Sequence, residues 1–359
     1  MSRSNLSTAR RLHLHPSLPQ ALKPINLPPL RECPLVSALV ANYNYARFLP
    51  EAMESALKQT YPNLEIVVCD DGSTDNSCQV VERFASQDAR IKLIRQANGG
   101  VSSALNAAYA GAQGDLIAVL DADDAWFPQR LDFIVRKFVN KPEVGLVTHL
   151  MRGVDAFSRT IHKRIPEKTL SAGWLGQELL CGKPIVSVAA SALTFRRQVA
   201  ELIFPLPEAF RKGADALLRN RAMLLAPVGT VEEVLALYRL HGNNLTGLPT
   251  SLSVAEIDAQ MTALERIQQD VVDSARRFHG VDPQVLKDVE RPEKRSLVLS
   301  RALLNGQRLS QKEIAKSKRG GARWWWAALF ISPPWLSKRI YVSWRKGGMV
   351  SRLARLVAQ

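Results

Sequence analysis

Blocks of apolar residues alternate with amphipathic blocks between residues 34 and 151. Five short apolar runs, each ending in a polar or turn-forming cluster, are typical of buried strands: residues 35–42, 64–70, 91–96, 115–120 and 144–151. Four segments between them carry apolar residues at helical spacing: residues 48–59, 73–87, 101–113 and 128–140. Strands that alternate with helices of this length predict right-handed βαβ units. We therefore expect an α/β fold with a mostly parallel twisted sheet and helices on both faces.

The regular alternation weakens after residue 152. We expect a hairpin there, followed by a helix near 170–181, an apolar segment at 185–197, a helix at 215–226 and a strand-like segment at 228–244. Residues 253–310 have a highly charged helical pattern. The chain is therefore expected to divide into a flexible N-terminal arm, a main domain, an accessory helical region and a tail, with bounds at 1–33, 34–250, 251–311 and 312–359.

The net charge of +15 belongs to the two ends of the chain. Residues 1–31 carry five basic residues and no acidic one, and residues 312–359 carry eleven basic residues and one acidic residue. The 280 residues between them balance, with 32 basic and 32 acidic side chains. A neutral core with basic ends argues against a nucleic-acid-binding domain, and it favours an anionic surface that the ends contact.

The sequence predicts an intracellular protein. No apolar run reaches the roughly 18 residues that a membrane-spanning helix needs, and the first thirty residues lack the apolar stretch of a secretory signal. The four cysteines have neither metal-site nor disulfide spacing, which suits a reducing cytoplasm.

Three polar clusters follow predicted strands. They read ANYNY at 41–45, DDGSTD at 70–75 and DADDAW at 121–126. Ligands of open α/β sheets bind at the carboxyl ends of the strands, so we expect these clusters along one rim. No glycine-rich dinucleotide or P-loop motif follows any strand, which argues against a Rossmann dehydrogenase or a P-loop nucleotide site.

The DADD cluster is a candidate metal site. Asp121 and Asp123 flank one residue of an extended segment, so both side chains can face the same way. Carboxylate oxygens suit Mg²⁺ or Mn²⁺, which in turn bridge to substrate phosphates. The alternative for Asp123 and Asp124 is that they cap the helix that begins near Pro128.

The sequence resembles the inverting glycosyltransferases of family two, which have a GT-A fold. The resemblance rests on the segments 38–77, 98–124 and 238–244, which contain DDGSTD, NGG, DADD and YRLHGNN, and it extends from about residue 35 to about residue 247. DDGSTD alone is moderately specific, but DADD about fifty residues later, with NGG between, makes a specific combination.

The resemblance implies roles for residues that match the motifs. Asp70 is expected to accept a hydrogen bond from the base, which favours uracil, and Asp121 to lie near the ribose and donor sugar. The full expected donor-nucleotide set is Asn42, Tyr43, Asn44, Asp70, Asp71, Asn98, Gly99 and Asp121. The expected metal ligands are Asp123 and His241, where His241 could instead contact the diphosphate or be structural. For Asp70, Asp71 and Asp75, turn and capping chemistry is the alternative.

The family takes its general base from a Glu-Asp pair at the start of a helix. Asp215 matches the base in this sequence, while Ala214 stands where the glutamate is usual. Leu105 likewise stands where the family frequently has an arginine before Asn106. Asp215 could alternatively act only as a helix N-cap.

The C-terminal tail has the composition of a membrane-interface segment. Five of the seven tryptophans fall within residues 324–344, beside clustered lysines and arginines, and Pro333 and Pro334 interrupt the apolar stretch. Tryptophan prefers the headgroup region and basic residues prefer an anionic leaflet. We expect peripheral attachment to the cytoplasmic face of a membrane, with packing on a protein partner as the alternative.

We therefore expect a metal-dependent inverting glycosyltransferase that moves a sugar from a nucleotide-sugar donor, preferentially a UDP-sugar, to a glycan or lipid-linked acceptor. One alternative is a glycosyltransferase-like protein that binds donor or partner without transfer, as the departures at Ala214 and Leu105 would allow. A second is a sugar nucleotidyltransferase, which would need a Gly- and Arg-rich loop after the first strand that ANYNYARF lacks.

Overall fold

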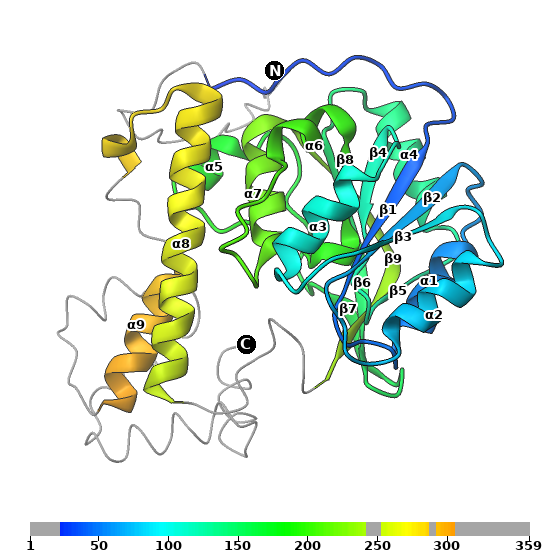
Figure 1. The fold of residues 1–359 in the computed structure, drawn as a ribbon. Coiled ribbons are helices and arrows are strands. Elements are labelled where there is room, and N and C mark those ends of the chain that lie inside the picture. Colours follow the sequence, from blue (N-terminus) through cyan, green and yellow to red (C-terminus); the bar gives the residue numbers. More distant parts are fainter. Residues whose placement is uncertain (1–21, 242–252, 287–291, 306–359) are drawn as a thin grey trace, which may run out of the picture.

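The computed structural model describes residues 22–241, 253–286 and 292–305. In these residues nine strands form one mixed sheet (Figure 1). One half is a parallel unit in the order β3-β2-β1-β4, made of β1 (Val36–Asn42), β2 (Leu64–Asp70), β3 (Ile91–Arg95) and β4 (Leu116–Val119). The helices that connect or follow these strands are α1 (Leu49–Leu57), α2 (Ser77–Ala85), α3 (Val101–Ala110) and α4 (Arg130–Asn140). The predicted βαβ alternation is confirmed in this half.

The other half of the sheet is largely antiparallel. From β4 the order continues β8-β6-β9-β5, and β7 pairs with the outer part of β6. These strands are β5 (Ala125–Trp126), β6 (Leu146–Asp155), β7 (Thr160–Ile165), β8 (Leu193–Arg196) and β9 (Val228–Leu240). Only β6 and β9 run parallel there. Strand β8 comes from the apolar segment at 185–197, whose periodicity does not reveal its direction.

Two differences from the sequence-based expectation have local causes. The helix expected near 170–181 is only α5 (Gly176–Leu180), because Gly173, at φ 88°, forms an antiparallel bridge with Val228 and so commits the preceding residues to extended structure. The apolar pattern at 144–151 continues as β6 to Asp155, where a turn leads into the expected hairpin with β7.

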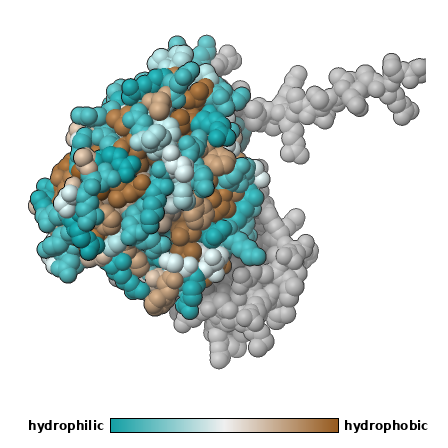
Figure 2. Space-filling model, turned by 90° about the vertical axis from the view of Figure 1, so that its right-hand side faces the viewer, coloured by the Kyte–Doolittle hydropathy of each residue, from teal (hydrophilic) through white to brown (hydrophobic). Residues whose placement is uncertain are grey.

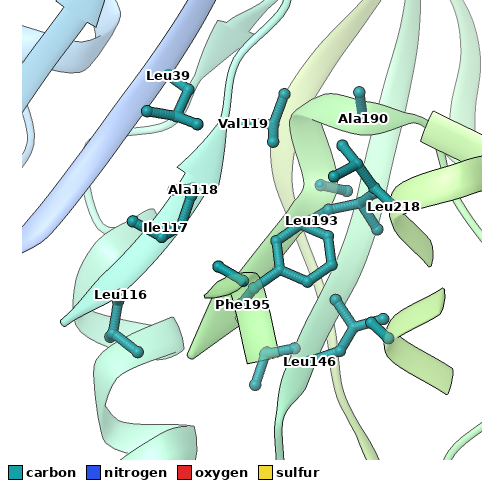
Figure 3. Packing of buried hydrophobic residues seen from close by; sticks show 14 of the residues in the cluster. Leu39, Leu116, Ile117, Ala118, Val119, Leu146, Ala190, Leu193, Phe195 and Leu218 are labelled. Atoms are coloured by element: carbon teal, nitrogen blue, oxygen red, sulfur yellow. The ribbon is translucent and has the colours of Figure 1, made fainter. Parts of the chain in front are cut away.

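The core lies where the two halves of the sheet meet. Ile117 of β4 is paired with Phe195 of β8, and Phe195 and Leu193 pack beside Leu218 of α7 (Ala214–Leu225), while Leu116, the residue before Ile117, packs on the other face of the sheet (Figure 3). All five side chains are fully buried. Because burial of each large apolar side chain contributes about 1.5–3 kcal/mol, this junction holds the parallel half, the antiparallel half and α7 in one body.

The surface on the side of β2 and β3 is mainly hydrophilic, with apolar residues in separate patches (Figure 2). The apolar positions of α1, Leu49, Ala52, Met53 and Ala56, face inward and are buried. This arrangement explains the amphipathic pattern of the segment.

A long helix packs beside α7, on the side of the molecule away from β2 (Figure 1). This helix, α8 (Val254–His279), begins with a capping box in which Ser253 and Glu256 bond each other's backbone N–H, and it ends at Gly280 in the left-handed conformation. The remaining helices are α6 (Arg197–Ile203) and α9 (Pro292–Leu304). Helix α9 packs on α8. The accessory region therefore places α8 against α7 and α9 against α8.

A buried ion pair joins α7 to α8. Arg221 donates to both carboxylate oxygens of Asp270, at 3.1 and 2.5 Å, and its Nη1 donates to the carbonyl of Ile203 at 2.7 Å. Both charged side chains are less than a tenth exposed. The guanidinium therefore connects α6, α7 and α8 in one network.

The segment before β1 lies against the main domain from residue 22. Leu22 and Leu27 are buried, and the N–H of Ile25 donates to the carbonyl of Leu225 at 2.8 Å. Arg31 pairs with Asp115, whose carboxylate also accepts the N–H of Leu35. The rest of the expected N-terminal arm, and the Trp-rich tail, lie outside the described residues. None of the helices in the described ranges is long and apolar enough to cross a membrane.

The ion pair between α7 and α8 predicts a large effect of one carboxylate. Asp270→Ala leaves the Arg221 charge buried without its partner, and it should lower the free energy of unfolding by about 3–5 kcal/mol. Asp273→Ala on the same helix removes an exposed carboxylate and should change it by less than about 0.5 kcal/mol. Urea unfolding of both variants measures the difference. Equal effects would show that the pair does not hold the helices together.

Candidate active site

The polar clusters after β1, β2 and β4 meet at one edge of the sheet, as expected. The strands are neighbours in the order β2-β1-β4, and Asn42 at the end of β1 is in register with Asp70 at the end of β2. Asp121 follows β4. Parallel strands place their carboxyl ends on the same rim, so one edge receives all three clusters.

Asn42, Asp70 and Ser73 form a buried network. The amide of Asn42 donates to Asp70 Oδ2 at 2.7 Å and to the Ser73 hydroxyl at 3.1 Å, and the N–H of Ser73 donates to Asp70 Oδ1 at 2.9 Å. Asn42 and Asp70 are 1% and 2% exposed. Tyr43, by contrast, is 45% exposed at the rim. Asp70 therefore combines turn chemistry with a place at the edge of the expected nucleotide pocket.

Asn44 holds the turn of DDGSTD. It adopts φ 59°, and its side-chain oxygen accepts the N–H groups of Thr74 and Asp75 at 2.8 and 3.3 Å. Asp75 accepts the N–H groups of Ala46 and Ser77, which links this turn to the one after β1.

Asp71 organises the NGG loop. Its carboxylate accepts the N–H groups of Gly99 and Gly100, both at 2.8 Å, and the side-chain amide of Gln96 at 2.7 Å. A Cβ at Gly99 would lie 2.6 Å from the hydroxyl of Ser103, so the loop can approach α3 this closely only with glycine there. Asn98, on the same loop, contacts Arg211.

Three carboxylates meet after β4. Asp121, Asp123 and Asp124 each offer an oxygen within 4.8 Å of the others. Asp124 is buried, and its two oxygens accept the Ser191 hydroxyl at 2.6 Å and the N–H of Arg239 at 2.9 Å. These bonds attach the DADD turn to the segment just before β8 and to β9. The expected alternative of Asp124 as a cap for α4 does not hold, because its oxygens bond to other segments.

His241 lies at the acidic cluster, as the resemblance implies. Its Nε2 lies 2.9 Å from Asp123 Oδ2. The imidazole stacks on Phe48, with ring centroids 4.9 Å apart, and meets Tyr45 edge-on at 5.7 Å. Two aromatic rings from the segment before α1 thus orient a histidine that follows β9.

Arg239 stabilises the DADD turn. Its side chain is 1% exposed, and it donates to the backbone carbonyl of Asp123 at 2.7 Å and to Glu51 at 2.6 Å. Another donor of the guanidinium reaches the hydroxyl of Ser158 in the β6–β7 turn at 2.8 Å. Because the guanidinium bonds to the Asp123 backbone carbonyl and pairs with Glu51, it holds the DADD turn, and with it Asp123, in place.

The electrostatics indicate a cation site. Burial, with repulsion from Asp123 and Asp215, raises the pKa of the Asp121 carboxyl to about 8. Burial and the charges of Asp123 and Asp121 also raise the pKa of the Asp124 carboxyl. Burial and the charges of the acidic cluster raise the pKa of the Tyr238 hydroxyl to about 12. The raised pKa values of Asp121 and Asp124 show that ionised carboxylates are unfavourable here, and a divalent cation would offset the negative potential of the cluster.

Asp215 lies on the first turn of α7, close enough to Asp121 to raise its pKa. Gly213, in the left-handed conformation, turns the chain into the helix. The Asp215 side chain is 29% exposed, and its Oδ2 lies 3.7 Å from Arg219 one turn further on. No side-chain capping bond is present at the described start of α7, so the N-cap alternative for Asp215 has no support. The neighbouring Ala214 is buried.

The loop that leads to Asp215 is attached to α3. The Asn106 side chain donates to the carbonyl of Leu206 at 2.9 Å and accepts its N–H at 2.7 Å. The Ser102 hydroxyl donates to the carbonyl of Phe210 at 2.7 Å. These bonds connect the NGG side of the rim to the helix that carries Asp215.

Two residues that build the site are absent from the sequence-based set. Arg239 precedes His241 by two positions on an extended segment, so the period of two places both on one face, and this signal could have found it. Ser191 lies in the apolar stretch VAASALTF, where no spacing marks it. Its importance follows from the pairing of β8 between β4 and β6, which the local pattern does not encode.

The comparisons with known proteins agree with this arrangement. The family model described as Glycosyl transferase family 2 matches residues 37–204. An uncharacterized glycosyltransferase of Nostoc sp. is 38% identical over 229 residues, which are 63% of this chain and 71% of that protein.

Two solved structures have a similar fold at 18% sequence identity. TarS of S. aureus (residues 1–349, in complex with UDP-GlcNAc) aligns with a TM-score of 0.51 over 88% of this chain and 92% of that one. The mannosyltransferase PcManGT of Pyrobaculum calidifontis, in complex with GDP-Man and Mn²⁺, aligns with a TM-score of 0.50 over 93% and 90%. The expected GT-A architecture is thereby confirmed.

The raised pKa of Asp121 predicts that this residue lowers stability. An unfolded aspartate has a pKa near 3.9, so between about pH 4 and pH 8 folding requires the uptake of a proton, and stability is lost as the pH rises. Without metal, Asp121→Asn should therefore raise the free energy of unfolding at pH 7.5 by about 1–3 kcal/mol, and the gain should shrink towards pH 4. Urea unfolding in EDTA at both pH values measures it, with Asp273→Asn as the matched exposed control. A destabilised variant at pH 7.5 would contradict this account.

Proposed function

The chain belongs to glycosyl transferase family 2, and from this premise we propose that it is a metal-dependent, inverting transferase that moves a sugar from a UDP-sugar to a hydroxyl of a glycan or lipid-linked acceptor. The observation that carries the proposal is the convergence of Asp121, Asp123, His241 and Asp215 at one edge of the sheet. These side chains come from three distant segments of the chain. A nucleotide-binding rim, a cation site and a candidate base are thus adjacent.

The donor set of the acidic cluster fits Mn²⁺ or Mg²⁺. Asp123 and His241 would hold the ion, with Asp121 close by, whereas the oxygens of Asp124 already accept bonds from Ser191 and Arg239. A divalent cation held there would supply positive charge to the donor diphosphate and to the leaving nucleotide. The structure of PcManGT contains Mn²⁺, in agreement with this choice.

The donor nucleotide would lie along the rim formed by Asn42 to Asn44, Asp70 and the NGG loop. The Asp70 carboxylate accepts one hydrogen bond each from Asn42 and Ser73, and its remaining lone pairs could accept the imide N–H of uracil. Asp71 would act indirectly, by holding the N–H groups of Gly99 and Gly100 so that the backbone can approach the ribose. The structures of TarS with UDP-GlcNAc and of PcManGT with GDP-Man show that proteins of this fold bind either nucleotide, so the choice of a UDP-sugar rests on Asp70.

Asp215 is proposed as the general base. Its partly exposed carboxylate takes the proton of the acceptor hydroxyl, whose oxygen attacks the anomeric carbon as the bond to the diphosphate oxygen breaks. The leaving nucleoside diphosphate keeps the bonding electron pair. A single displacement of this kind inverts the anomeric configuration and forms no covalent intermediate on the protein.

A second candidate is a protein that binds nucleotide-sugar without transfer. Its support is Ala214, which is buried next to Asp215 and stands where the family usually has a glutamate. The Asp215 carboxylate and the intact acidic cluster favour the transferase.

We also propose that the enzyme works at the cytoplasmic face of a membrane. The support is compositional: the basic Trp-rich tail at 312–359, which lies outside the described residues, has the residue types that an anionic interface attracts. Nucleotide-sugar and acceptor, and not nucleic acid, are its expected partners.

The transferase proposal predicts donor cleavage that depends on metal and on two carboxylates. With Mn²⁺, one UDP-sugar from a panel should release UDP, and Asp123→Ala and Asp215→Asn should each lower the rate by about 10²–10⁴-fold. Glu233→Gln, an exposed change on β9, should leave it within twofold. A coupled UDP assay measures the release. Nucleotide-sugar binding without release in wild type would favour the non-catalytic candidate.

A further inference from the structure

A cavity of about 160 Å³ lies beside the helix of Asp215. It is bounded by α5 and the loop after it, by α7 and by α8, and its lining includes Lys183, Ser187, Arg219, Asn220, Leu264 and Ile267. None of the residues that the catalytic proposal uses lines this cavity.

The charged residues that line the cavity are both basic. Lys183 comes from the loop after α5, and Arg219 comes from α7; no Asp or Glu lines the cavity in the described part of the chain. Among the described residues, no carboxylate lies within ion-pair distance of Lys183. Arg219 is 17% exposed and donates to the carbonyl of Val188 at 3.2 Å, with Asp215 at 3.7 Å. Two cations and one peripheral carboxylate leave an excess of positive charge facing the cavity.

The cavity begins next to the proposed base, at Ala216, and extends along α7 past Arg219. Ala216, Arg219 and Met223 share one face of α7, because they are spaced by three and four residues. Arg219 follows Asp215 by four residues, a rise of about 6 Å along the helix axis. Asp215 is thus close both to the acidic cluster, through Asp121, and to the cavity, through Arg219.

Helix α8 completes the cavity. Leu264 and Ile267 form its outer wall, and a Cβ at Gly213 would meet Ile267 Cδ1 at 3.9 Å, so α8 also reaches the residue before α7. The buried pair of Arg221 and Asp270 holds this wall against α7. The wall comes from the accessory helices, separate from the nucleotide-binding half of the sheet (Figure 1).

We propose that this cavity binds an anionic group of the acceptor, a carboxylate or a phosphate, about one sugar unit from the hydroxyl that Asp215 deprotonates. The inference rests on the proposed function and names the acceptor class of the same site. Lys183 and Arg219 supply charge-assisted hydrogen bonds in a partly buried setting, where they are stronger than neutral ones. Ser187 and Asn220 add neutral polar groups, and the apolar wall fits one face of a sugar ring.

The test compares charged and neutral probes of one shape. Glucuronate, glucose 6-phosphate and glucose are titrated by calorimetry into the full chain with UDP and Mn²⁺ present. At least one charged probe should bind tenfold or more tightly than glucose. Lys183→Ala should weaken the binding of that probe by at least fivefold and leave the binding of glucose unchanged. Lys183→Arg should retain most of the affinity for the charged probe. Lys168→Ala, an exposed lysine outside the cavity, is the matched control.

Each outcome decides a separate point. A preference for glucuronate indicates an acidic sugar in the acceptor, and a preference for glucose 6-phosphate indicates a phosphorylated one. Equal binding of all three probes, or a charge preference that Lys183→Ala leaves intact, would overturn the proposal. UDP release by wild type in the absence of any probe tests the transferase function separately. If UDP is released but the cavity shows no preference for charged probes, only the cavity assignment is refuted. If charged probes are preferred but no UDP is released, the cavity does not bind an acceptor.

Discussion

The repulsion among the carboxylates after β4 is the constraint on which the rest of the site depends. Asp121, Asp123 and Asp124 come from one short turn, and burial makes their charges costly. The fold holds them together with groups from distant segments, because Ser191 and the N–H of Arg239 bind Asp124. The fold thus maintains a cluster of negative charge that lowers its stability, which is typical of functional centres.

The antiparallel half of the sheet makes this arrangement possible. Strand β8 brings Ser191 to β4, and β9 brings Arg239 and His241 to the same edge. Helix α7 then packs over β8 and carries Asp215 to the cluster, while α8 holds α7 through Asp270. The accessory helices therefore contribute to the site through the position of α7.

The parallel half of the sheet and the common edge of the three polar motifs were predictable because both follow from local patterns. Apolar runs and turn clusters mark β1 to β4, and the spacing of Asp121 and Asp123 suggests a cation by itself. Contacts across long sequence separations were not predictable in this way. Ser191 sits in an apolar stretch without a signal, and the partner of Arg221 lies 49 residues away on a helix whose packing no local pattern specifies.

The claim that the acidic cluster holds a divalent cation for the donor diphosphate is the centre of this account. Electron paramagnetic resonance of Mn²⁺ in the presence of UDP tests it most directly, with wild type compared with His241→Ala and Asp123→Ala. We expect one bound Mn²⁺ per chain in wild type, weaker binding in the first variant and none in the second. No binding in wild type, or binding that both substitutions leave unchanged, would contradict the account.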